Sequence, residues 1–282
     1  MKILVPTDFS EKAGSALNYA LALFKGKRCV FYLLSIQETS NYISDDLLQS
    51  DAKESLYDSL ILKNRKKLDE LVKELESQYS GEDYTFKTIA NYSGFTNAIK
   101  KVIALEKIEL TVMGSNGSGS AKEILFESHS LRVIHKVPAP VLVIPQDYQY
   151  NGLDKILLGM DYDQIVDPSE LEPLRKIVFS SRTFVEFLQM KKKDFNKEQW
   201  NSQSEKLNKS FSDLKFTFQT IMGVSFVAAV ISVVQIQNPD LIVLKAEKEK
   251  FLDRFFYGSV ISSIIKKTKV PVLILHPTSK KE

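Results

Sequence analysis

The sequence predicts an α/β protein built from two tandem copies of a doubly wound unit, each with a parallel five-stranded sheet. Short apolar runs rich in β-forming residues alternate along the chain with segments of helical periodicity. The strand runs are apolar at successive positions, which is typical of a parallel sheet that helices cover on both faces. The same pattern restarts near residue 154, so the repeated unit is a whole domain.

The first copy provides five strands with helical segments between them. The apolar runs that predict strands are 2–6, 29–36, 84–90, 108–114 and 139–145. Residues 10–25 and 94–107 place apolar side chains three and four positions apart, which is the period of a helix. Ser10 is a candidate N-cap of the first helix, and Glu11 lies favourably in its first turn.

A long charged amphipathic stretch separates the second and third strands, in an insertion at about 41–79. We interpret it as one or two helices that cover the sheet. The alternative is a projecting helix that docks a protein partner.

The second copy follows the first strand by strand. The aligned segments are 154–163 with 1–10, 184–190 with 30–36, 214–221 with 83–90, 239–245 with 108–114, and 270–277 with 139–146. These alignments predict domains at 1–147 and 152–282, joined by a short polar link. Each domain ends in an apolar strand, and exposed strand edges tend to pair. We therefore expect an intramolecular pseudo-dimer with a rough two-fold axis, which leaves room for a further homodimer.

Composition narrows the classes of function. The net charge of +3 is too small to indicate a nucleic-acid partner. Cys29 is the only cysteine, which excludes an intrachain disulfide and fits a reducing compartment. We find no signal peptide and no apolar run of the roughly 18 residues that cross a bilayer, so we expect a cytoplasmic protein with no membrane contact. No zinc spacing, nucleophile elbow or Walker loop is present, so we expect no catalytic and no metal-ligating residues.

The stretch VMGSNGSGSAKEILFESHS at 112–130 is the clearest candidate for a binding site. Ligands of open parallel sheets lie beyond the carboxyl ends of the strands, where both Asp8 and this loop are expected. Gly114 and Gly117 allow main-chain N–H groups to approach an anion closely. Asp8 has two compatible roles, since its carboxylate can accept hydrogen bonds from a ribose or adenine and can also cap the helix near Ser10.

A strand ending in Asp, a late Gly-x-x-Gly loop, and a Gly-Ser pair that opens a helix resemble the universal stress protein family. The resemblance covers nearly the whole chain twice, as in tandem members, and implies the adenine nucleotide alpha hydrolase-like architecture. Members that carry G-x2-G-x9-G-[S/T] bind ATP, so the resemblance implies ATP or a related adenine nucleotide, with Mg²⁺, as the ligand. It implies Asp8 at the adenosine end and backbone of Ile36 (Met190 in the second copy) near adenine. The phosphate-binding positions that it implies are Gly114, Gly117, Ser118, Ser128 and Ser130.

Both copies depart from that pattern. In the first copy Glu127 replaces the third glycine, and two like charges about 4 Å apart cost roughly 4 kcal/mol at an effective dielectric near 20. Outward rotation or a bridging Mg²⁺ would lower that cost, and the carboxylate could instead occupy the anion site itself or be solvated. In the second copy Gly258 is retained, but Lys245 and Lys248 replace the loop glycines. We interpret these lysines as solvated loop residues.

Two functions follow. The first is a stress-response module that binds an adenine nucleotide at a degenerate site in the first domain and at none in the second, with weak ATP hydrolysis at most. Protein partners of unknown identity would bind differently to the nucleotide-bound and nucleotide-free forms. The alternative is a scaffold or interaction module that retains the fold without a ligand.

Overall fold

The computed structural model describes residues 1–36, 52–91, 94–115, 131–160, 167–178, 182–190, 205–207, 209, 215–246 and 254–276, with side chains except at 52–61 and 254–259. The first half contains β1 (Lys2–Thr7), α1 (Glu11–Leu23), β2 (Cys29–Ile36), α2 (Ala52–Gln78), β3 (Tyr84–Asn91), α3 (Phe95–Glu106), β4 (Leu110–Ser115), helical residues 131–136, and β5 (Val141–Pro145). The second half contains β6 (Lys155–Met160), the 3₁₀ helix η2 (Pro168–Leu171), α5 (Glu172–Ile177), β7 (Phe184–Met190), β8 (Lys215–Ile221), α7 (Phe226–Gln237), β9 (Leu241–Lys245), α8 (Arg254–Lys267) and β10 (Val272–Leu275).

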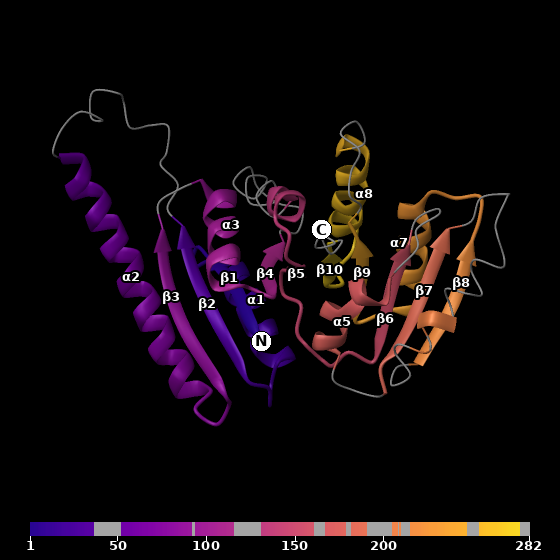
Figure 1. The fold of residues 1–282 in the computed structure, drawn as a ribbon, viewed down its shortest axis with the longest axis horizontal. Helices are drawn as coiled ribbons and strands as arrows, with labels where there is room; N and C mark the ends of the chain where they lie inside the picture. The colour runs from indigo at the N-terminus through magenta and orange to yellow at the C-terminus, as the bar shows by residue number, and fades with distance from the viewer. Residues whose placement is uncertain are drawn as a thin grey trace.

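All ten strands form one sheet in the order β3-β2-β1-β4-β5-β10-β9-β6-β7-β8 (Figure 1). Every neighbouring pair is parallel except β5 and β10, which are antiparallel. The two predicted doubly wound units are therefore confirmed, and so is the intramolecular pseudo-dimer through the last strand of each. The domain boundaries at 147 and 152 stay a prediction.

The β5–β10 pairing, which we call the seam, lies on the pseudo-two-fold axis. Leu142 faces Leu273, and these two residues occupy the same position in the two copies. The pairs on either side are related by the two-fold axis: Val141 faces Ile274, and Val143 faces Val272, where Val272 is the equivalent of Val141 and Ile274 is the equivalent of Val143. A register in which equivalent residues meet is that of an isologous interface, here inside one chain. The seam converts two exposed strand edges into one continuous sheet.

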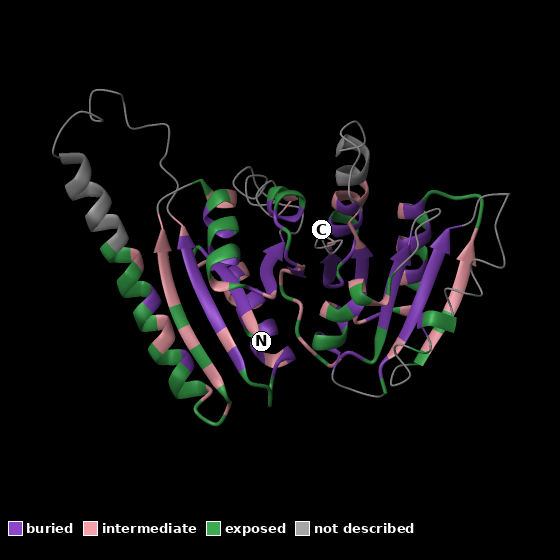
Figure 2. Ribbon diagram, viewed as in Figure 1, coloured by how far each residue is buried: buried purple, intermediate pink, exposed green. Residues whose placement is uncertain are grey.

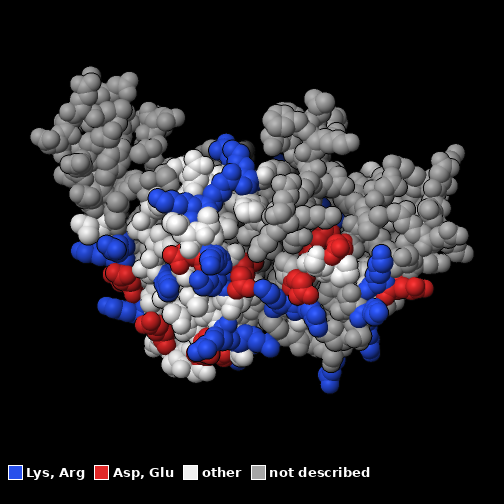
Figure 3. Space-filling model, in the orientation of Figure 1, with Lys and Arg blue, Asp and Glu red and all other residues white. Residues whose placement is uncertain are grey.

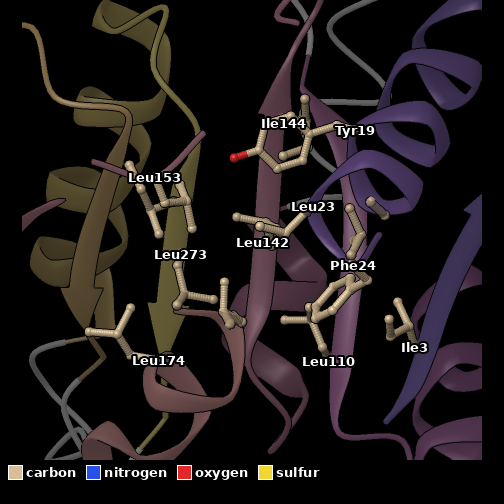
Figure 4. Packing of buried hydrophobic residues seen from close by; sticks show 14 of the residues in the cluster. Ile3, Tyr19, Leu23, Phe24, Leu110, Leu142, Ile144, Leu153, Leu174 and Leu273 are labelled. Atoms are coloured by element: carbon tan, nitrogen blue, oxygen red, sulfur yellow. The ribbon is translucent and has the colours of Figure 1, made fainter. Parts of the chain in front are cut away.

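Two apolar layers cover the sheet, one on each face. Figure 2 shows the strands in the middle of the sheet as mostly buried. One layer contains side chains of α1, α2 and α5, and the other contains side chains of α3, α7 and α8. Both layers run across the seam. Figure 4 shows Tyr19 and Ile144 of the first half in the same layer as Leu153 and Leu273 of the second. The halves therefore share a core on each face of the sheet.

Helix α2 accounts for much of the predicted insertion. Leu68 and Leu75 are buried, and Leu71 and Val72 contact the same apolar layer as α1. Figure 1 shows α2 along the outer side of β3. Its described side chains support the interpretation that the insertion covers the sheet. None of the helices in the described segments is both long and apolar enough to cross a membrane.

A partly buried hydrogen bond between side chains appears at the same place in both halves, with different residues. The Tyr32 hydroxyl donates to Glu106 at the end of α3, at 2.8 Å. At the aligned positions, Gln237 Nε2 at the end of α7 donates to Glu186 Oε1 at 3.1 Å. Both pairs join the second strand of a unit to the carboxyl end of its third helix, so the repeat preserves the contact while the donor and acceptor change sides.

Two polar contacts join the halves beside the seam. Lys176 Nζ of α5 lies 2.6 Å from Glu109 Oε1, and the other Glu109 oxygen accepts from Lys2 N at 2.9 Å. Burial opposes ionisation, but these hydrogen bonds lower the pKa of Glu109 below its ordinary value. On the other face, His276 follows β10, and its Nε2 lies 2.7 Å from the Ile134 carbonyl of the first half. A carbonyl only accepts, so Nε2 carries the proton.

Nδ1 of His276 is buried and has no hydrogen-bond partner among the described residues. Burial lowers the pKa of His276 below its ordinary value, because the charged imidazolium would lose its hydration there. Between the two pKa values the unfolded chain binds the proton and the folded chain does not. We therefore expect the free energy of unfolding to fall as the pH drops below about 6.5, the ordinary histidine value.

The test is urea unfolding at several pH values for wild type and for His276→Gln, whose amide N–H can still reach Ile134. As the pH falls, wild type should lose more unfolding free energy than His276→Gln, because only wild type has the histidine that takes up a proton on unfolding. A difference that is constant from pH 7.5 to 5 would contradict this account.

Candidate functional site

The order of strands in the first half reverses between β1 and β4, and ligands of open α/β sheets bind at such a switch point. β1 and β4 pair only at Ile3 with Leu110 and at Leu4 with Thr111. The equivalent strands of the second half pair at four positions, up to Gly159 with Leu244. The hydrogen-bonded ladder thus ends two residues earlier in the first copy.

Pro6 explains the early end of that ladder. The Lys2 carbonyl accepts from Glu109 N, so Lys2, Leu4 and Pro6 have their main-chain polar groups on the β4 side. Pro6 has no main-chain N–H, so it cannot donate the next hydrogen bond of the ladder to β4. Gly159 is the aligned residue of the second copy and keeps its N–H. The aligned sequences KILVP and KILLG contain this signal, although Pro6 is not among the residues that the sequence singled out.

Asp8 follows β1 in a tight turn. Its Oδ1 accepts from Ser10 N at 3.0 Å and from Ser10 Oγ at 2.5 Å. Ser10 is the N-cap of α1, as predicted, and its Oγ accepts from Ala13 N at 3.4 Å. Phe9 has a φ of 63°, which turns the chain from strand to helix. Asp8 is exposed, and its Oδ2 makes no hydrogen bond to any described residue. One oxygen thus braces the helix cap, and the other remains for a ligand.

Ile36 ends β2, next to β1. Val30 N donates to the Met1 carbonyl, and continuing that register would pair the Ile36 carbonyl with Phe9 N. Phe9 N donates to Thr7 Oγ1 instead, at 3.0 Å. β1 therefore leaves the Ile36 carbonyl without its ladder partner, at the strand end where the family resemblance implies adenine.

Gly114 lies in β4 directly under the first turn of α1. A Cβ at this position would lie 2.9 Å from the Lys12 carbonyl oxygen, closer than real Cβ contacts. The structure thus gives Gly114 a packing role beside its predicted role toward phosphate. Asp8, Ile36 and Gly114 lie at the carboxyl ends of β1, β2 and β4, which are adjacent in the sheet. The other predicted contacts, Gly117, Ser118, Ser128 and Ser130, lie outside the described residues, as does Glu127.

In the second copy Lys245 occupies the position of Gly114. Its Nζ lies 2.6 Å from Glu170 Oε2, and the two side chains are only 15% and 13% exposed. The interpretation of Lys245 as a solvated loop residue is therefore wrong. Glu170 also accepts from Asp167 N at 3.1 Å in a capping box. Lys248 and Asp161 lie outside the described residues.

A shift in the helix start makes room for the lysine. In the first copy α1 begins at Glu11 and covers Gly114. In the second copy the described helical segment begins at Pro168. Pro168 corresponds to Gly14 when residues 184–190 are aligned with residues 30–36. A second difference from expectation is that Gly258 and Ser259 lie inside α8, which begins at Arg254, and do not open it.

These features define a class of protein: two doubly wound α/β units joined edge to edge, with a candidate ligand edge at the first switch point. The model of the "Universal stress protein family" matches residues 1–145 and 183–276. The chain belongs to the universal stress protein family.

Individual relatives agree with this assignment. Over 155 residues the chain is 29% identical to "Universal stress protein MJ0577" of Methanocaldococcus jannaschii, a match that covers 51% of this chain and 93% of the relative. The crystal structure of a universal stress protein from Archaeoglobus fulgidus is similar to this chain, with a TM-score of 0.74 and 19% sequence identity. The match covers 100% of this chain and 97% of the Archaeoglobus chain. The structure of the functionally unknown protein PA1789 from Pseudomonas aeruginosa matches with a TM-score of 0.60 and 14% sequence identity, over 98% of this chain and 92% of PA1789. The last two show the fold.

We predict that Gly114→Ala destabilises the protein by about 1–3 kcal/mol, because the new methyl group meets main-chain atoms that cannot rotate away. Gly14→Ala is the matched control within α1, where a Cβ meets nothing within 4 Å. Gly14→Ala should be neutral or stabilising by up to about 1 kcal/mol. Urea unfolding measures both, and equal effects at the two positions would contradict the packing role of Gly114.

The Lys245–Glu170 pair predicts strong coupling. Lys245→Met should cost about 1–3 kcal/mol, because it leaves a largely buried carboxylate without its cation. Adding Glu170→Gln should recover much of that loss, since glutamine still accepts from Asp167 N. A double-mutant cycle by chemical denaturation measures the coupling free energy. Additive effects of the two substitutions would show that the pair contributes nothing.

Proposed function

We propose that the protein binds an adenine nucleotide at the carboxyl ends of β1, β2 and β4 of its first copy, and none at the equivalent place in the second. The observation that carries the proposal is the early end of the β1–β4 ladder, which the second copy lacks. Some members of the family bind adenine nucleotides, and the exposed Asp8 and the backbone at Ile36 suit the ribose and base.

The second copy argues against a second site through its own side chains. Lys245 and Glu170 satisfy each other where the first copy has glycine and a helix start. A phosphate there would compete with the Glu170 carboxylate for the same ammonium. The residues that would hold phosphate in the first copy are those of the 114–130 loop, and a bound Mg²⁺ would offset charge between phosphate and Glu127.

The proposed activity is binding. The distribution of surface charge supports a small-molecule ligand over nucleic acid, because Lys and Arg are interspersed with Asp and Glu among the described residues on the face in Figure 3. A scaffold role is the second candidate, and the Lys245–Glu170 pair favours it, since an ion pair occupies the position that aligns with Gly114 of the first copy.

The test is calorimetry with ATP and Mg²⁺ on wild type, Asp8→Asn and Asp161→Asn. In Asp8→Asn the side-chain carbonyl would still accept from Ser10, but an N–H donor would replace Oδ2. We therefore expect affinity to fall about tenfold or more, the value of a hydrogen bond to a charged group. Asp161→Asn, at the aligned position of the second copy, should leave affinity unchanged. Equal losses from both variants would contradict a site confined to the first copy.

A third variant, Glu127→Gly, restores the family pattern. We expect tighter binding than wild type, up to about a thousandfold if the full like-charge repulsion is removed. If neither wild type nor Glu127→Gly binds, the nucleotide function fails and the scaffold role remains.

A further inference from the structure

A second candidate site lies between α1 and the segment that follows β5. A cavity of about 440 Å³ opens there, which is within the range of small-molecule sites. Tyr19 of α1 and Tyr148 and Tyr150 of the connecting segment line it, and we call it the tyrosine pocket. The nucleotide edge, at the carboxyl ends of β1 and β4, shares none of its lining residues.

The three rings form one cluster. The Tyr19 ring centroid lies 5.4 Å from that of Tyr150, with the planes perpendicular, and 5.9 Å from that of Tyr148. Tyr148 OH donates to the Asp240 carbonyl of the second half, at 3.4 Å. Tyr19 is only 2% exposed, yet its hydroxyl makes no hydrogen bond to any described residue.

Charge in the pocket has one sign. Asp147 lines it, and no lysine or arginine does so among the described residues. Burial first, then the neighbouring tyrosines and the Asp240 carboxylate, raise the pKa of Tyr19, so its hydroxyl stays neutral. The negative charge near the pocket comes from the Asp147 and Asp240 carboxylates, which would attract a cation and repel a phosphate.

We propose that the tyrosine pocket binds a small organic cation of the alkylated ammonium class. Electron-rich faces of tyrosine rings attract ammonium groups within about 6 Å, and the methyl groups of an alkylated cation can pack against the ring carbons of Tyr148 and Tyr150. Asp147 supplies the counter-charge. The Tyr19 hydroxyl, Asn18 and Gln149 can orient a polar tail on the ligand.

Occupancy would stabilise the contact between the two halves. The pocket is built by α1 of the first half and by the connecting segment, whose Tyr148 is bonded to the second half. A ligand that binds the folded chain shifts unfolding by mass action. The melting temperature should therefore rise with the concentration of the cation.

The experiment is calorimetry of the full chain with choline, and with 3,3-dimethylbutan-1-ol as the uncharged isostere of choline. We expect choline to bind at least about tenfold more tightly, a difference of about 1.4 kcal/mol. Equal affinities would show an apolar pocket with no preference for charge, and no heat with choline at millimolar concentration would overturn the proposal outright. A primary amine, ethanolamine, that bound more tightly than choline would overturn the alkylated class.

Asp147→Asn tests the counter-charge without disturbing the fold, because Asp147 has a φ of 64° and asparagine tolerates that region well. We expect choline affinity to drop about fivefold or more, since the variant removes the negative charge that faces the ammonium group. Asp69→Asn, exposed on α2, is the control and should leave binding unchanged. Unchanged affinity in Asp147→Asn, with binding otherwise present, would contradict the role given to its charge.

Discussion

The antiparallel contact between β5 and β10 is the constraint around which the molecule is arranged. It brings Leu142 against its own counterpart Leu273, so both copies must present the same apolar edge in the same register. Once that register is set, the apolar layers of the two halves meet on both faces of the sheet. The Glu109–Lys176 ion pair and the His276–Ile134 hydrogen bond then lie beside the seam. Their contribution to stability depends on the strand pairing, because without it the partners would belong to separate surfaces.

The two copies share one strand order but differ by a few residues at the switch point. Pro6 removes one N–H and ends a ladder, whereas Gly159 continues the equivalent ladder. Gly114 allows a helix to lie on its strand, whereas Lys245 requires that helix to start later and takes Glu170 as its partner. These are local differences in sterics and hydrogen bonding at the switch point, and the strand order of the unit stays the same.

The sequence predicted the strands, the repeat and the seam because each depends on apolar pattern, which is local and regular. It predicted the neighbourhood of Asp8, Ile36 and Gly114 because parallel strands bring their carboxyl ends to one edge. It failed at Lys245, because the burial of that side chain depends on a shift in the start of a helix that an alignment with gaps does not show. The link at 147–153 looked polar, yet its tyrosines pack against α1, since an amphipathic ring can bury its face and keep its hydroxyl near polar atoms.

Helix α1 connects these features. Its N-cap is braced by Asp8, its first turn lies on Gly114, and its middle carries Tyr19 into the tyrosine pocket. The helix is 13 residues long, which is about 20 Å at 1.5 Å per residue, and its N-cap and Tyr19 contact different parts of the molecule. The first end belongs to the edge proposed for a nucleotide, and the middle belongs to the contact between the halves. Because α1 packs tightly on the sheet, whatever fixes its cap also fixes the position of Tyr19, and the two proposed sites therefore share one rigid element.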